Sequence, residues 1–238
     1  MKISSSPDWE GSGPKRVLLR DEAYTTIKEF LFAEESEEAL SERMLAARLN
    51  LGLGPVRSAV ERLRAEGLLT AMMNSGLRLP DITAREILDF YEMRMVIETH
   101  VVASLTGKLS RDQFQQLDEI LDEQDSCAQS RNTIRYHQLD LDFHTTLAEL
   151  HGNSEMVRTL QQMRDKMHRL SRRLHRTHPE RLSLNAQQHR AIVDAIRGGE
   201  ADKSRNRMQA HLAWGRAFTL DPDGRMGGDW QNLTVDAS

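Results

Sequence analysis

Four residues in the C-terminal half of the chain have the types and the spacing of a metal site. Asp140 and His144 are four residues apart, so on a helix they are separated by a rise of about 6 Å and lie on the same face. His189 and His211 follow, one on each side of the diglycine at 198–199. That diglycine predicts a turn between two antiparallel helices, and a separation of 22 residues would bring the two histidines level.

Three imidazoles and one carboxylate suit Zn²⁺ or Ni²⁺, which bind such ligands at about 2.0–2.2 Å. A site of this kind could hold the carboxylate of a small organic acid, or it could activate water in a metal-dependent hydrolase. No motif places a general base beside it. His137 and His151 lie on the same helical stripe as His144, one or two turns away, and could be further ligands or bystanders.

Composition describes the kind of protein that would carry this site. The 238 residues are 39% hydrophobic and 29% charged, which is typical of a soluble protein with two domains. Cys127 is the single cysteine, so the chain forms no internal disulfide. The first residues lack the apolar segment of a signal peptide, and no apolar run reaches the roughly 20 residues of a membrane span. We expect a cytoplasmic protein.

The C-terminal part is predicted to be a strand-free, antiparallel bundle of six helices over residues 81–220. Apolar residues recur there at helical spacing. The expected helices are Thr83–Leu105, Arg111–Ser126, Arg131–Leu150, one from about Met156 to Leu174, Glu180–Arg197 and Glu200–Leu220. The tail from Asp221 to Ser238, and Met1 to Pro14, are predicted to be disordered.

Residues 15–80 are predicted to form a winged helix-turn-helix. Ser41 is a good N-cap, Pro55 can occupy the first position of a helix, and Gly67 can end that helix. The expected elements are helices Asp21–Phe32, Ser41–Leu49 and Pro55–Glu66, a turn containing Asn50, Gly52 and Gly54, and hairpin strands Leu68–Met72 and Leu77–Leu79. The fold class is therefore mainly α.

A helix-turn-helix places its second helix in the major groove of DNA. The outward positions of that helix are Arg57, Ser58, Glu61 and Arg62. Residues 39–79 hold six arginines against three glutamates, although the whole chain has a net charge of −4. Such a local positive surplus is expected in a DNA-reading unit joined to an acidic partner domain.

Two stretches of sequence resemble a known family. LSERMLAARL at 40–49 and PVRSAVERLRAEGL at 55–68 resemble the DNA-binding domain of GntR-family regulators, over residues 23–79. The bundle at 81–220 resembles the FadR-type C-terminal (FCD) ligand-binding domain, nearer its six-helix, VanR-like branch. The resemblance implies a ligand-responsive transcription regulator, with repression favoured, that binds a pseudo-palindromic operator as a homodimer through contacts in the bundle.

The resemblance also implies roles for particular residues. Asp140, His144, His189 and His211 stand at the family's metal-ligand positions, and Gln188 stands where the family often has Glu. Arg94 resembles an arginine that faces the effector pocket and could clamp a carboxylate. The alternative is that Arg94 forms an ion pair with Glu98, one helical turn later. The implied DNA contacts are Arg43, Arg57, Ser58 and Arg62, with Ser75 and Gly76 at the wing tip.

The sequence departs from the family at residues 52–54. Relatives usually carry a Ser-Arg-Thr-type triplet there that contacts the operator, whereas this chain has Gly52, Leu53 and Gly54. The resemblance therefore implies DNA binding without the family's usual operator contacts. The departure leaves two alternatives to the regulator: the metal-dependent hydrolase, and a helical adaptor that has lost specific DNA binding.

Overall fold

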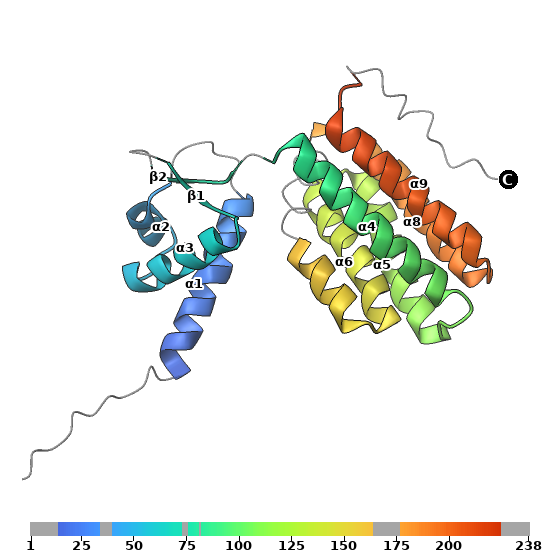
Figure 1. The fold of residues 1–238 in the computed structure, drawn as a ribbon, viewed down its shortest axis with the longest axis horizontal. Coiled ribbons are helices and arrows are strands. Elements are labelled where there is room, and N and C mark those ends of the chain that lie inside the picture. Colours follow the sequence, from blue (N-terminus) through green and yellow to red (C-terminus); the bar gives the residue numbers. More distant parts are fainter. Residues whose placement is uncertain (1–13, 34–39, 73–75, 81, 164–176, 225–238) are drawn as a thin grey trace, which may run out of the picture. The chain divides into compact units, whose positions relative to one another are not determined.

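The computed structural model describes residues 14–33, 40–72, 76–80, 82–163 and 177–224. The chain divides into two compact units, Met1–Asp81 and Ile82–Ser238, and each has its own hydrophobic core. Figure 1 shows that helices make up most of both units, so the fold is mainly α, as predicted. None of the described helices is long and apolar enough to cross a membrane.

The first unit has the element order of a winged helix-turn-helix. Its elements are α1 (Pro14–Ala33), α2 (Glu42–Arg48), α3 (Leu53–Ala65), β1 (Thr70–Met72) and β2 (Gly76–Arg78). The strands pair antiparallel with Ala71 opposite Leu77, and Leu40 forms an isolated bridge to Leu77. Ala23, Ile27 and Leu31, spaced four residues apart on α1, are buried in one core with the apolar face of α3.

Two predicted caps in this unit are confirmed, and the predicted start of the third helix is wrong. The Ser41 hydroxyl accepts a hydrogen bond from the backbone N–H of Met44 at 3.1 Å, and Gly67 has a φ of +72° just after α3. Helix α3 begins at Leu53 rather than Pro55, so Gly54 is helical and not part of the turn. Pro55 is tolerated because the first four N–H groups of a helix have no partner within it.

The second unit is a bundle of long helices. Its elements are α4 (Ala84–Leu105), α5 (Arg111–Ser130), α6 (Thr133–His151), α8 (Arg181–Arg197) and α9 (Ala201–Leu220), and residues 154–163 are also helical. Capping boxes at Thr83 and Ser110 begin α4 and α5. Gly199, with a φ of +77°, makes the predicted turn between α8 and α9.

These helices pack so that α6, α8 and α9 meet at one place in the core. Helix α4 packs along α9 and α6, α5 packs on α6 and α8, and α8 packs on α9 (Figure 1). The predicted fourth helix is confirmed over 154–163, with Leu160 in the core, and its predicted continuation to Leu174 falls outside the described residues. Asp221, predicted to open a disordered tail, is instead buried at the end of α9.

Candidate metal and effector site

The bundle brings three of the four predicted metal ligands together. Helix α6 carries His144, α8 carries His189 and α9 carries His211, and all three are buried. The Nε2 atom of His211 lies 3.3 Å from Nε2 of His144 and 3.4 Å from Nε2 of His189. One possible ligand atom from each histidine lies within 4.8 Å of those of the other two.

Hydrogen-bond acceptors on the outer side of the cluster hold two of the three rings, those of His189 and His211, in place. Nδ1 of His189 lies 2.9 Å from Oε1 of Gln124, whose own amide N–H donates to the Leu139 carbonyl at 3.0 Å. Nδ1 of His211 lies 2.9 Å from Oε1 of Gln188. In the tautomer that donates from Nδ1 to these oxygens, the Nε2 lone pairs of His189 and His211 face into the cluster.

Burial favours the neutral form of His189 and His211. Loss of hydration lowers the pKa of His189 and of His211 well below the usual value of 6.5, and the neighbouring histidines lower both pKa values further. A neutral imidazole with a free Nε2 is the form that binds a metal ion.

The donor set fits a divalent metal. Tetrahedral ligands about 2.1 Å from a zinc ion lie about 3.4 Å from one another, which is close to the observed Nε2 separations. Without a cation, three lone pairs would face one another in a buried space, an arrangement that costs free energy. The metal-loaded form would relieve that repulsion.

Asp140 lies at the edge of the cluster. Its Oδ1 is 3.6 Å from Nε2 of His189 and accepts a hydrogen bond from the Asn185 amide at 2.8 Å. The predicted rivals lie elsewhere: neither His137 nor His151 joins the metal-ligand group found among the described residues, and His151 instead packs edge-on against His100.

Glu98 is the residue that sequence reasoning did not assign to the site. Its Oε2 lies 2.6 Å from Nδ1 of His144, and its Oε1 accepts a hydrogen bond from Nε of Arg94 at 2.5 Å. Burial raises the pKa of this carboxyl, but Arg94 and His144 lower it more, to about 2. Arg94 therefore has the ion pair that was one of its two predicted roles, and Glu98 connects it to a candidate metal ligand.

A cavity of about 30 Å³ opens beside the cluster. Its lining combines candidate metal ligands with cationic, polar and aromatic side chains. The lining residues are Tyr91, Arg94, Asp140, His144, Arg181, Asn185, His211, Trp214, Gly215 and Thr219. Arg94 thus also borders the space that its other predicted role requires.

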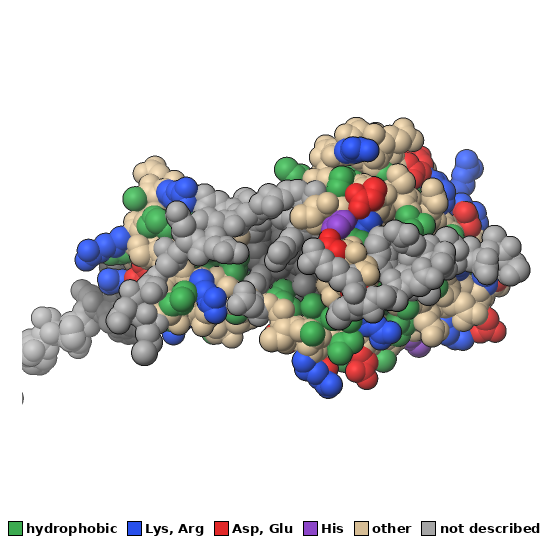
Figure 2. Space-filling model, turned by 90° about the horizontal axis from the view of Figure 1, so that it is seen from above, with side chains coloured by type: hydrophobic (Ala, Val, Ile, Leu, Met, Phe, Trp, Pro, Cys, Tyr) green, Lys and Arg blue, Asp and Glu red, His purple; other side chains and the backbone are tan. Residues whose placement is uncertain are grey.

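The predicted DNA-contacting residues occupy several surfaces of the first unit. Arg43 and Arg57 are exposed on α2 and α3, and Arg57 pairs with Glu42 at 3.1 Å. Ser58 is half-buried on α3, Gly76 begins β2, and Ser75 falls outside the described residues. The view in Figure 2 shows basic side chains on this unit, towards the left, with little acidic surface among its described residues.

Arg62 has contacts within its own unit. Its guanidinium pairs with Asp21 at 3.3 Å and Glu66 at 3.1 Å, and it lies 3.9 Å from the centre of the Tyr24 ring. These contacts link α3 to α1, so Arg62 contributes to the packing of the recognition helix whether or not it also contacts DNA.

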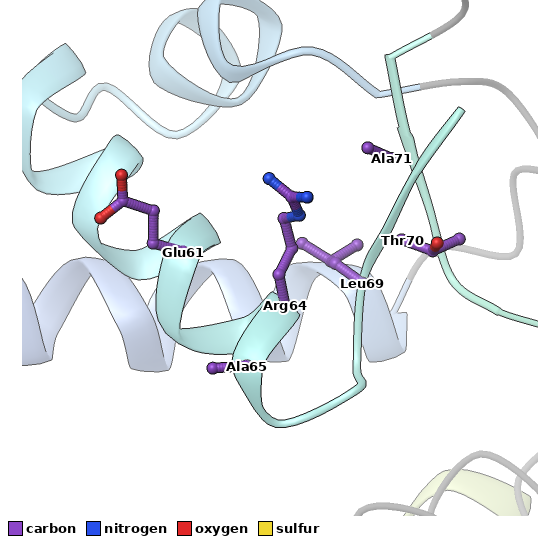
Figure 3. A pocket seen from close by; sticks show the side chains of 6 residues that line it. All are labelled: Glu61, Arg64, Ala65, Leu69, Thr70 and Ala71. Atoms are coloured by element: carbon purple, nitrogen blue, oxygen red, sulfur yellow. The ribbon is translucent and has the colours of Figure 1, made fainter. Parts of the chain in front are cut away.

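A larger and more open hollow, of about 450 Å³, lies between α3 and β1. Figure 3 shows Arg64 rising from α3 into this space in front of β1, with Glu61 one turn earlier. Its described lining residues include no cluster of metal ligands, and its two charged residues, Glu61 and Arg64, have opposite signs. The smaller cavity in the bundle is therefore the better candidate for a ligand site.

Comparisons with known proteins agree with the fold. Residues 89–213 match the FCD domain. The chain is 29% identical over 130 residues to the Nta operon transcriptional regulator of Aminobacter aminovorans. The aligned stretch covers 55% of this chain and 61% of that protein. It is 28% identical over 217 residues to the HTH-type transcriptional repressor NanR of Cronobacter sakazakii, covering 82% of this chain and 81% of NanR.

A solved structure shows the same fold. A GntR transcriptional regulator from Rhodococcus sp. RHA1 superposes with a TM-score of 0.68 and 22% identity, over 87% of this chain and 98% of that one. These similarities favour a regulator over the metal-dependent hydrolase that the histidine set also allowed. The chain belongs to the FCD-domain family and is a regulator of the GntR/FadR type.

Proposed function

We propose that this regulator binds a pseudo-palindromic DNA operator as a homodimer, and that a small organic acid bound at a divalent metal ion controls that binding. The observation that carries the proposal is the convergence of three buried Nε2 atoms beside a cavity. Repression is the direction we propose, because NanR, which aligns over most of the chain, is a repressor.

His144, His189 and His211 would hold the metal, and Asp140 is placed to complete the set. Zn²⁺ or Ni²⁺ is the ion that this donor set favours. When bound, the ion supplies a Lewis acid that attracts a carboxylate oxygen. Gln124, Gln188 and Glu98 orient the three imidazoles.

DNA binding is proposed for the exposed side of α2, α3 and the hairpin. Arg57 and Ser58 lie near the start of α3, where recognition helices contact base edges, and Arg43 is placed to meet phosphate. Gly76, at the hairpin, and Ser75 would approach the backbone. One such helix reads only a few base pairs, so a two-fold dimer on a two-fold operator is the expected arrangement.

The dimer contact is proposed for α4, which exposes three apolar side chains. Leu88 is 38% exposed, Met93 is 46% exposed and Val96 is 66% exposed. Exposed apolar side chains gathered on one helix mark an interaction surface.

Helix α4 also offers a route from the effector to the DNA-binding unit. It begins at Ala84, directly after the first unit ends at Asp81, and it carries Glu98, which contacts His144. An acid that binds one arrangement of α4 better than another would change DNA affinity by that difference, typically about 1–3 kcal/mol.

The test uses the full chain purified without chelators. Metal analysis should find one divalent ion per chain, and His144→Ala combined with His211→Ala should lose it. His100→Ala, which removes an exposed histidine outside the cluster, is the matched control. A genome-wide binding selection with and without organic acids should return a two-fold site. Full metal content in the double variant would refute the metal centre, and absence of any specific site would favour the adaptor.

A further inference from the structure

Two buried hydrogen-bond donors in the bundle cavity have no acceptor within the part of the chain that the structure describes. Arg181, the first residue of α8, is 6% exposed, and Trp214 on α9 is 2% exposed. Among the described residues, neither Nε of Arg181 nor Nε1 of Trp214 has a hydrogen-bond partner. Both side chains line the cavity beside His144 and His211. Buried donors are normally satisfied, so an unpaired couple on one cavity wall indicates a missing acceptor.

The two arginines of the cavity differ in their charge balance. Arg94 donates to Glu98 through Nε and Nη2, so its charge is compensated inside the protein. Arg181 forms no ion pair with any carboxylate that the structure describes. Its guanidinium instead lies 3.1 Å from the centre of the Phe218 ring and 4.1 Å from the centre of the Trp214 ring.

Aromatic stacking does not remove the cost of burying this cation. Loss of hydration lowers the pKa of Arg181 to about 9, and the more distant Tyr91 and Asp140 only partly offset that effect. A ring that contacts a guanidinium through its π-face accepts no conventional hydrogen bond, so the Nε–H of Arg181 still needs an acceptor. A water molecule could fill the cavity of about 30 Å³, but it would not neutralise the charge.

We infer that the effector is a small dianion, with one carboxylate at the metal and a second acidic group bound by Arg181 and the indole N–H of Trp214. The inference rests on the proposed metal centre. With a divalent ion in place, Asp140 would offset one of its two charges and Arg94 would cancel the charge of Glu98, which leaves one net positive charge. Arg181 raises the net charge of the site to two. A monocarboxylate leaves one of them buried and unpaired, whereas a dianion neutralises both.

The cavity of about 30 Å³ must widen to admit such an acid, and its wall at Tyr91 is closely packed. Tyr91 is hydrogen bonded through its hydroxyl to Thr219 at 3.0 Å, next to Gly215. A Cβ at Gly215 would lie 3.1 Å from that hydroxyl, so the glycine leaves space for the tyrosine ring. A compact acid fits this enclosure better than a long one.

The test compares acids of equal length and different charge on the zinc-loaded full chain. Calorimetry is run with dicarboxylates from malonate to glutarate and with the monocarboxylates of the same carbon number. We expect at least one dicarboxylate to bind about tenfold or more tightly than its monocarboxylate partner, since a hydrogen bond between charged groups is about twice as strong as a neutral one. Equal affinities, or no binding by any dicarboxylate, would overturn the inference.

Three variants assign the preference to the named residues. Arg181→Gln should keep its zinc and lose the dicarboxylate preference, and Trp214→Phe should weaken that preference while keeping the aromatic stack. Arg181→Lys, which keeps the charge, should retain part of the preference and guards against a folding defect in the glutamine variant. Failure to bind zinc in the wild type would refute the proposed metal centre, whereas zinc binding with an unchanged preference in all three variants would refute only the role of Arg181 and Trp214.

Discussion

The carboxylate of Glu98, on α4, lies 2.6 Å from Nδ1 of His144, on α6. Its other oxygen accepts the Nε–H of Arg94, so one buried side chain joins a candidate metal ligand to a cation that lines the neighbouring cavity. Both helices pack against each other, and α4 is the helix that follows the DNA-binding unit. The contact therefore couples the position of α4 to the state of the histidine cluster.

Glu98→Gln should weaken metal binding about 10–100-fold, because the ring of His144 loses its anionic partner. A competition titration against a zinc chelator measures the change. Glu92→Gln, on the exposed side of the same helix, is the control and should leave the affinity unchanged. Equal zinc affinity in the two variants would show that Glu98 pairs with Arg94 but does not support His144 as a metal ligand.

Arg94→Met should lower the free energy of unfolding by about 3–5 kcal/mol, because it leaves the Glu98 carboxylate buried beside His144 without its cation. Urea unfolding of the metal-free protein measures the loss. Adding Glu98→Gln should restore part of it, since the second change removes the uncompensated charge. A double variant that is as unstable as the sum of the two single variants would contradict this coupling.

Stability of the metal-free protein should fall as the pH drops below about 6.5. Burial holds the pKa values of His189 and His211 well below 6.5 in the folded state, so the unfolded chain binds more protons in that range. The contribution of these two histidines to the free energy of unfolding is complete above the unfolded-state pKa. As the pH falls below that pKa, it is lost at up to about 1.4 kcal/mol per pH unit for each histidine. Urea unfolding between pH 7.5 and 5.5 checks this; His100→Gln should keep the slope and His189→Gln should reduce it.

Residues that act through local geometry or regular spacing could be predicted from the sequence. The Ser41 cap, the Gly67 helix end and the hairpin follow from residue type and neighbours. The histidines of α6, α8 and α9 meet because helical rise and one short turn fix their levels. The start of α3 was misplaced because Pro55 is acceptable at several positions of a first turn.

The residues that contact the candidate metal ligands could not be predicted, because those contacts depend on side-chain packing between helices. Gln124 reaches His189 across 65 residues of sequence, and nothing in its spacing indicates that contact. Glu98 was visible only as the helical neighbour of Arg94. The lack of an ion pair at Arg181 among the described residues is a property of the folded interior, since Glu180, its neighbour in sequence, lies near His178 instead.

Arg57→Ala should weaken operator binding by about 1–3 kcal/mol if its side chain reads a base. In the free protein Arg57 pairs with Glu42, so Glu42→Gln should release it and leave or raise the affinity. Arg43→Ala should weaken binding to all sequences alike and reduce the salt dependence by about one unit. Fluorescence anisotropy over a range of salt concentrations separates these effects; unchanged affinity in both arginine variants would place the DNA contact elsewhere.

Val96→Glu on α4 should break the proposed homodimer. The side chain is 66% exposed in the single chain, so the charge costs little in the monomer, whereas it would be buried opposite the apolar face of a second copy. Ile134→Glu on α6 is a matched control because Ile134 is also 66% exposed. Sedimentation at micromolar concentration should give about twice the chain mass of 27.2 kDa for the wild type and Ile134→Glu, and the single mass for Val96→Glu. A wild-type monomer would refute the dimer. If Val96→Glu is still a dimer, the dimer contact lies elsewhere than on α4. The two recognition helices would then be spaced differently, and so would the two half-sites of the operator.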